Sequence, residues 1–159
     1  MDINTYAGDI TSLSDTEVFV FGANQSGFHG AGSAGYASFG VHGNRWREFD
    51  YGNKPKGWMG KWAVKGSVGA MRGWDGRSYG LVTVTRCGAK RSISGEQMVI
   101  NIGEMYACAR SYPKLTFYVA QGSAGGLNGY SGMEMATFFK LAAPIPENVK
   151  FQLGFSKLF

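Results

Sequence analysis

The sequence predicts an α/β fold built on a mixed, largely parallel central sheet. Short apolar runs with the composition of β-strands recur at residues 18–21, 78–85 and 115–120. The first and third of these runs lead directly into glycine-rich loops. Stretches in which apolar residues recur at helical spacing separate the later runs. Alternation of strands and helices along one chain is typical of α/β sandwiches.

The first strand is predicted at Val18–Phe21, where a continuous run of β-branched and aromatic residues suits burial on both faces. Small residues at 30–40 could open a helix that packs closely on the sheet, although its glycines weaken the helix. Residues 43–76 are rich in glycine and hold all four tryptophans, and we expect long loops there with one short strand at 61–65. The second clear strand is predicted at 78–85.

A helix is predicted to begin after Ser94, a good N-cap residue, with Glu96 placed favourably in its first turn. Its buried stripe is expected at Met98, Ile102, Met105 and Ala109, with Val99 and Tyr106 beside it. Tyr112-Pro113 ends this helix, because proline cannot continue it.

The third strand is predicted at 115–120, followed by a second glycine-rich loop at 121–129. A short helix is expected at Ser131–Leu141, and Pro144 and Pro146 prevent it from continuing. Its apolar face comprises Met135, Phe138 and Phe139. A last strand is expected at Val149–Leu153.

Length and composition indicate one globular domain spanning residues 1–159, with 44% hydrophobic residues. The net charge of +5 favours an anionic ligand or a nucleic acid. Cys87 and Cys108 form no C-x-x-C pair and no set with metal-ligand spacing, and we expect reduced thiols in a cytoplasmic protein. The first ten residues lack the pattern of a signal peptide, and no apolar run is long enough to span a membrane.

The first glycine loop, at residues 22–34, reads GANQSGFHGAGSA and follows a strand. Glycines at the carboxyl end of a strand let backbone N–H groups approach phosphate oxygens, and a following helix N-terminus adds its dipole. The glycine spacing matches neither the Rossmann nor the P-loop pattern. The alternative is that these glycines serve only tight turns and close packing of a helix on the sheet.

The second glycine loop, at residues 121–130, reads QGSAGGLNGY and also lies between a strand and a helix. Two such loops could form the two walls of one diphosphate-binding cleft. The alternative is a pair of unrelated turns.

Three side chains near these loops are the first candidates for chemistry. Asn24 could orient a water molecule or hold a ribose hydroxyl, or it could cap its own loop. His29 could bind phosphate or act as an acid or base, or it could simply pack at a helix start. Tyr130 could stack on a base or belong to the core. Neither a pair of acidic residues, a Ser-His-Asp set nor a metal-ligand set is evident, so the sequence implies no cofactor and no metal.

Several of these stretches together resemble a family of small phage and bacterial macrodomain-like proteins. The resemblance rests on VFVFGANQSGFHGAGSA, GRSYGLVTVTR, FYVAQGSAGGLNGY and the closing ENVKFQLGFSKLF, and it covers nearly the whole chain except residues 44–71. It implies a three-layer α/β/α sandwich that binds an ADP-ribose-type nucleotide. Some members of the wider macrodomain group hydrolyse ADP-ribosyl bonds.

Carried over to this chain, the resemblance makes Asn24 the residue beside the distal ribose, and Asn24 and His29 the candidates for catalysis. The first diphosphate loop would comprise Gly27, His29, Gly30 and Gly32, and the second Gly122, Ser123, Ala124, Gly125 and Gly126. We also place Gly22, Ala23, Ala31, Thr85 and Tyr130 among the ligand-binding residues. Phe28 stands where the family often has a basic residue, and Ser33 stands where alanine is usual.

Three functions follow as expectations. The protein could hydrolyse an ADP-ribosyl bond on a protein or nucleic acid, or it could bind the nucleotide without turnover. In a phage, such a binder could sequester a cyclic ADP-ribose-like immune signal in the host cytoplasm. The third is a nucleic-acid-binding accessory protein, suggested by the lysines that alternate with tryptophans at 54–65.

Overall fold

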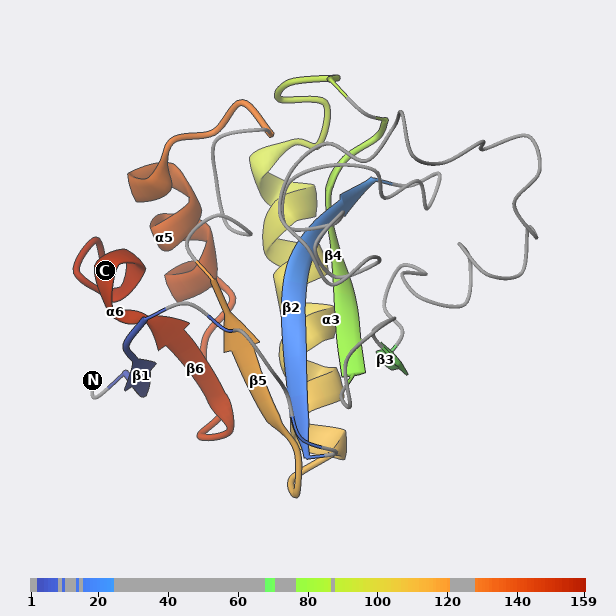
Figure 1. Ribbon diagram of the computed structural model, residues 1–159. Helices are drawn as coiled ribbons and strands as arrows, with labels where there is room; N and C mark the ends of the chain where they lie inside the picture. Colours follow the sequence, from blue (N-terminus) through green and yellow to red (C-terminus); the bar gives the residue numbers. More distant parts are fainter. Residues whose placement is uncertain are drawn as a thin grey trace.

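The computed structural model describes residues 3–8, 10, 14, 16–24, 68–70, 77–86, 88–120 and 128–159. Six strands and three helices lie in these ranges (Figure 1). In chain order they are β1 (Thr5–Tyr6), β2 (Glu17–Asn24), β3 (Val68–Ala70), β4 (Arg77–Val84), α3 (Gly95–Ser111), β5 (Thr116–Val119), α5 (Gly132–Leu141), β6 (Val149–Gln152) and α6 (Leu153–Ser156).

The described strands form one sheet in the order β1-β6-β5-β2-β4-β3. Strands β1, β6, β5, β2 and β4 are parallel to their neighbours, and only the edge strand β3 runs antiparallel, beside β4. The prediction of a mixed, largely parallel sheet is therefore confirmed. Strand β2 lies in the middle, with β5 on one side and β4 on the other, which explains why its sequence is continuously apolar.

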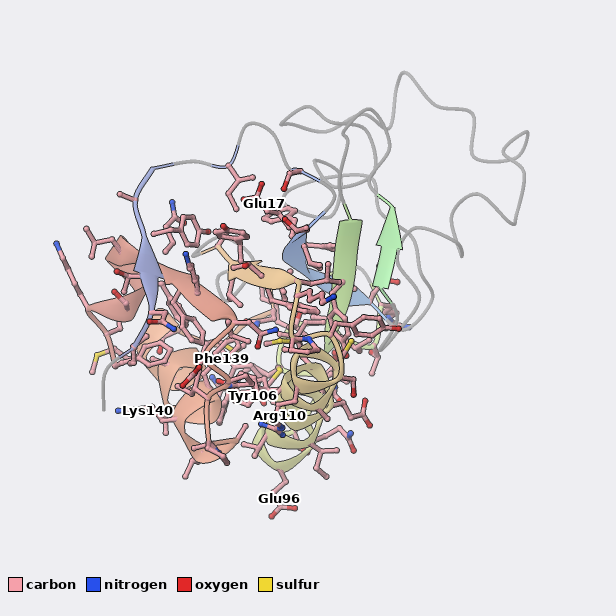
Figure 2. All side chains as sticks on the ribbon, turned by 90° about the horizontal axis from the view of Figure 1, so that it is seen from below. Glu17, Glu96, Tyr106, Arg110, Phe139 and Lys140 are labelled. Carbon is pink, nitrogen blue, oxygen red and sulfur yellow. The ribbon has the colours of Figure 1, made fainter. Side chains whose placement is uncertain are left out.

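Helices α3 and α5 both cover the same face of the sheet (Figures 1 and 2). Val18, Val20, Phe117 and Phe151 are fully buried and belong to the core on this face. Figure 2 shows Tyr106 and Phe139 between the helices and the sheet, whereas Glu17 lies on the opposite side. The described helices thus supply one layer on the sheet, and the predicted helix at 30–40 lies outside the described residues.

The α3 helix has the boundaries that the sequence predicted. The Ser94 side chain accepts a hydrogen bond from the Gln97 backbone N–H, and the helix ends before Tyr112. Its predicted stripe is fully buried: Met98, Ile102, Met105 and Ala109. Asn101 joins this helix to β4, because its Nδ2 donates to the carbonyl oxygen of Val82 at 2.9 Å.

The α5 helix carries a complete capping box. Ser131 Oγ accepts from the Glu134 backbone N–H, and the Glu134 carboxylate accepts from the Ser131 backbone N–H. Phe139 packs against a group of aromatic rings near the carboxyl end of the chain: Phe151, Phe155 and Phe159. Burial of a side chain of this size typically contributes about 1.5–3 kcal/mol.

Four elements differ from the sequence analysis. Strands β1 and β3 and the one-turn helix α6 were not predicted, and β2 is longer than expected because it continues to Asn24. The predicted strand at 61–65 lies outside the described residues. Within the described part of the chain, no helix is long and apolar enough to cross a membrane.

Candidate functional site

The order of the strands creates a switch point between β2 and β5. These two strands are parallel neighbours, with Val20 paired to Val119. After β5 the chain passes through α5 to β6, on the side of β5 away from β2. After β2, the next described strands are β3 and β4, on the side of β2 away from β5. In open α/β sheets, ligands bind outside the carboxyl ends of strands at such a point.

Both glycine-rich sequences begin at this switch point. The first starts within the last residues of β2, and the second starts one residue after β5. The second therefore follows a strand end as predicted, whereas residues 22–24 of the first, which were predicted as loop, belong to β2. The two strands are neighbours. The remaining predicted loop residues lie outside the described residues: Gly27, His29, Gly30, Ala31, Gly32, Gly122, Ser123, Ala124, Gly125 and Gly126.

Asn24 is the last residue of β2 and is only 8% exposed. It pairs with Val84, and the pairing register with β4 shifts between Ala23 and Asn24. Such irregularities turn a side chain away from the direction that regular pairing would give it. The preceding Gly22 and Ala23 also belong to β2 and pair with Leu81 and Val82. The structure therefore places a buried amide at the end of the central strand.

Thr85 follows directly after β4 and is half-buried. Because Asn24 pairs with Val84, Thr85 lies at the same edge of the sheet as Asn24. Its backbone N–H donates to Ser92 Oγ at 2.9 Å. The amide of Thr85 is thus occupied within the protein, and its side-chain hydroxyl is the donor that it could offer to a ligand.

Tyr130 is 6% exposed and makes the contacts of a core residue. Its hydroxyl donates to the carbonyl oxygen of Ile93 at 2.5 Å. The rings of Tyr130 and Phe138 pack edge to face, with their centroids 5.2 Å apart. The guanidinium carbon of Arg91 lies 4.5 Å from the Tyr130 ring centroid. These contacts agree with the alternative prediction for Tyr130, that it belongs to the core and does not stack on a base.

Arg91, Asn128 and Glu134 were not singled out from the sequence, although they join the β4–α3 connection to the start of α5. The Arg91 backbone N–H donates to the Asn128 carbonyl oxygen at 2.7 Å. The Arg91 guanidinium donates to both carboxylate oxygens of Glu134, at 3.2 and 3.1 Å. The S-x-x-E pattern at 131–134 was a detectable signal for Glu134, but nothing in the sequence indicated its partner.

The pKa of the Glu134 carboxyl is lowered by two groups. The hydrogen bond from the Ser131 backbone N–H has the larger effect, and the hydrogen bond from Arg91 adds to it. The Arg91 and Glu134 side chains are well exposed, so water screens their attraction. The ion pair therefore adds little to the stability of the fold, although it holds the two groups together.

Asn128 and Gly129 fix the backbone where the chain leaves the second glycine loop. Asn128 is 3% exposed, and its Oδ1 accepts from the Tyr130 backbone N–H at 2.8 Å. Gly129 has a φ of +87°, and a Cβ there would lie 2.8 Å from the Arg91 backbone nitrogen. Only glycine satisfies both demands. The exit of this loop is therefore held firmly against the β4–α3 connection.

A separate groove of about 570 Å³ lies at the amino ends of β5 and β6, away from the switch point. It is lined by Arg110, Pro113, Thr116, Pro144, Ile145, Pro146, Glu147, Asn148 and Lys150. Arg110 is already bonded to the Pro144 carbonyl oxygen at 3.2 Å. No sequence signal pointed to this groove, and its mixed lining does not single out one class of ligand.

The described residues contain no group of three or more histidine, cysteine or acidic side chains arranged to hold a metal ion. Cys108 is a free thiol on α3, and burial raises its pKa. Cys87, His42 and the four tryptophans lie outside the described ranges. Neither a comparison with protein-family models nor a search of curated protein sequences returned a match to this chain.

Proposed function

We propose that the protein binds an ADP-ribose-type nucleotide across the carboxyl ends of β2 and β5. One observation carries this proposal: two adjacent parallel strands, at a switch point of the sheet, each lead into a glycine-rich sequence. Crevices at such points are the usual ligand sites of open α/β sheets. Glycine-rich sequences at strand ends are suited to phosphate, because their amides can approach its oxygens closely.

The proposed assignment of ligand groups follows from residue chemistry. Amides of the two glycine loops would hold the diphosphate. Asn24 would hold the distal ribose, since its amide can both donate to and accept from hydroxyl groups. Its position at the carboxyl end of the central strand supports this role, because ligands of open α/β sheets bind outside the carboxyl ends of strands. The three-layer macrodomain-like sandwich is part of the same proposal.

The proposal also includes hydrolysis of an ADP-ribosyl bond as an alternative to binding alone. A water molecule held by Asn24 could attack the ribosyl carbon and break its bond to the modified group. His29 or the ligand's own phosphate would accept the proton of the water, and the departing group would take up a proton as it leaves. If no such step occurs, the protein is a binder that could sequester an ADP-ribose-derived signal. The substrate of a hydrolase would be an ADP-ribosylated protein or nucleic acid.

Calorimetric titration with ADP-ribose tests the proposal, with cyclic ADP-ribose isomers, NAD and AMP as comparison ligands. Mass spectrometry of each mixture then reports whether the ligand stays intact. Asn24→Ser should weaken binding of ADP-ribose by about tenfold, the loss expected for a hydrogen bond to a buried site. Asn101→Ser is the matched control, because Asn101 is equally buried but bonds to Val82 from α3.

The outcomes separate the candidate functions. Binding of intact ligand indicates a binder, and binding with turnover indicates a hydrolase. If none of the nucleotides binds, the glycine loops serve the fold alone. Steeply salt-dependent binding of DNA or RNA would then favour the nucleic-acid function.

A further inference from the structure

Arg91 presents a planar cation that is hydrogen-bonded along its edge and lies over an aromatic ring. The guanidinium donates to both oxygens of Glu134 and, at 3.4 Å, to the Gly129 carbonyl oxygen. The guanidinium lies over the Tyr130 ring, with its carbon 4.5 Å from the ring centroid. We propose that Arg91 is the stacking platform for the base of the nucleotide, an inference that rests on the proposed function.

The backbone of Arg91 is as firmly held as its side chain. Its φ of +54° is uncommon for a residue with a Cβ, and its N–H bonds to Asn128 at 2.7 Å. Arginine normally loses much side-chain freedom when it binds a ligand. Here the two hydrogen bonds to Glu134 and the contact with Tyr130 order the guanidinium in advance. A ligand that stacks on it therefore meets a smaller entropy cost.

The Arg91 side chain is accessible to a ligand. The Arg91 side chain is 56% exposed although its edge is bonded and Tyr130 is nearly buried beneath it. Guanidinium planes stack on aromatic rings, and they do so with nucleic-acid bases as well as with protein side chains. Arg91 covers one face of the Tyr130 ring, so Tyr130 cannot offer that ring face to a base. Arg91, which lies over the Tyr130 ring, therefore takes the base-stacking role that we first considered for Tyr130.

Arg91 also lies at the correct edge of the sheet. Its neighbour Ser92 bonds to the Thr85 amide, and Thr85 follows Val84, the partner of Asn24. The same loop therefore connects the platform to the end of the central strand. A nucleotide whose distal ribose meets Asn24 would extend its base along this edge.

The test compares ADP-ribose with ribose 5-diphosphate, which lacks the adenosine, that is, the base and the ribose attached to it. Arg91→Lys keeps the positive charge but loses the plane and the paired hydrogen bonds. We expect its affinity for ADP-ribose to fall by about tenfold, as is typical when a stacking partner of a base is removed. Its affinity for ribose 5-diphosphate should stay at the wild-type value. Arg86→Lys is the matched control, because Arg86 is an exposed arginine of the same connection.

A second variant tests the fixed orientation. Glu134→Gln keeps the capping box, in which glutamine can replace glutamate, but removes the charge that orients Arg91. We expect a smaller loss of ADP-ribose affinity than for Arg91→Lys, again with ribose 5-diphosphate unaffected. Thermal unfolding of each variant shows whether the fold is retained.

The possible failures are distinguishable. If Arg91→Lys binds ADP-ribose as tightly as the wild type, the stacking inference is overturned and the proposed function stands. An equal loss for both ligands would mean that Arg91 contacts phosphate, which also overturns stacking. If the wild-type protein binds neither ligand, the proposed function itself fails.

Discussion

The hydroxyl of Tyr130 donates a hydrogen bond of 2.5 Å to the backbone carbonyl oxygen of Ile93. This bond joins the residues before α5 to those before α3, and both groups are buried. It fixes one side of the candidate site independently of any ligand.

Removing that hydroxyl should destabilise the protein. In Tyr130→Phe the Ile93 carbonyl oxygen stays buried without its donor, and we expect a loss of about 1–2 kcal/mol in the free energy of unfolding. Urea denaturation measures this loss. Tyr112→Phe is the control, because Tyr112 is half exposed and its change should have little effect. Equal stabilities of the two variants would contradict the structural role of this bond.

Asn148 binds backbone carbonyl oxygens at the end of α3, although it lies far from that helix in the sequence. Its Nδ2 lies 2.8 Å from the Ala109 carbonyl oxygen, 3.1 Å from that of Tyr112 and 2.8 Å from that of Leu115. Asn148→Ala should therefore cost about 1–2 kcal/mol, because three backbone carbonyls at and after the end of α3 each lose one donor, although those of Ala109 and Tyr112 keep a backbone N–H. Asn4→Ala removes a single side-chain bond to an exposed carbonyl and should cost less. Chemical denaturation of both variants checks the ranking.

Phe139 is the centre of the aromatic group on the helix side of the sheet. It is fully buried against three other phenylalanines, so Phe139→Ala should leave a cavity and cost about 3–5 kcal/mol. Leu141→Ala, on the same helix but 66% exposed, should change stability by less than about 0.5 kcal/mol. Thermal or urea unfolding distinguishes the two. A small effect at Phe139 would contradict the packing described here.

Stability should fall in acid partly through Glu17. Its pKa is lowered from the ordinary value of 4.5, mainly by the hydrogen bond from the Ser14 backbone N–H at 2.9 Å and further by Tyr118. A carboxyl with a lowered folded-state pKa stabilises the protein above pH 4.5, and this contribution is lost as the pH falls through the folded-state pKa. Glu17→Gln should therefore be less stable at neutral pH and less sensitive to acid.

Urea denaturation between neutral pH and about pH 3 measures this difference, since that interval includes the loss of the carboxylate. Glu147→Gln, at an exposed carboxylate, is the control. If the stability of Glu17→Gln falls with acid as steeply as that of the wild type, Glu17 does not contribute.

The sequence predicted the regular elements where local signals agreed. Ser94 with Glu96, the apolar stripe of α3 and Pro113 together define both ends of that helix. Strands β1 and β3 are only two and three residues long, too short to show a pattern, and they form only through their partners. The extension of β2 to Asn24 was missed because glycine and asparagine usually indicate a loop, but pairing with β4 outweighs that tendency.

The candidate site was predicted less completely for a related reason. That two glycine loops follow strands is visible in the sequence. That their strands are neighbours depends on the pairing of Val18 with Phe117, which no local pattern reveals. Arg91 gave no signal either, because its importance comes from Glu134 and Tyr130, far away along the chain.

The pairing of β1 with β6 has a consequence for how the protein is made. Thr5 pairs with Phe151, so this edge of the sheet can form only after residue 151 has been synthesised. The central strand likewise obtains its β5 partner only after residue 116 has been synthesised. At about 5–20 residues per second, a ribosome needs several seconds to add the residues between the end of β2 and β5. During that interval the apolar surface of β2 lacks one neighbour, so the nascent chain is expected to depend on chaperones or rapid completion to avoid aggregation.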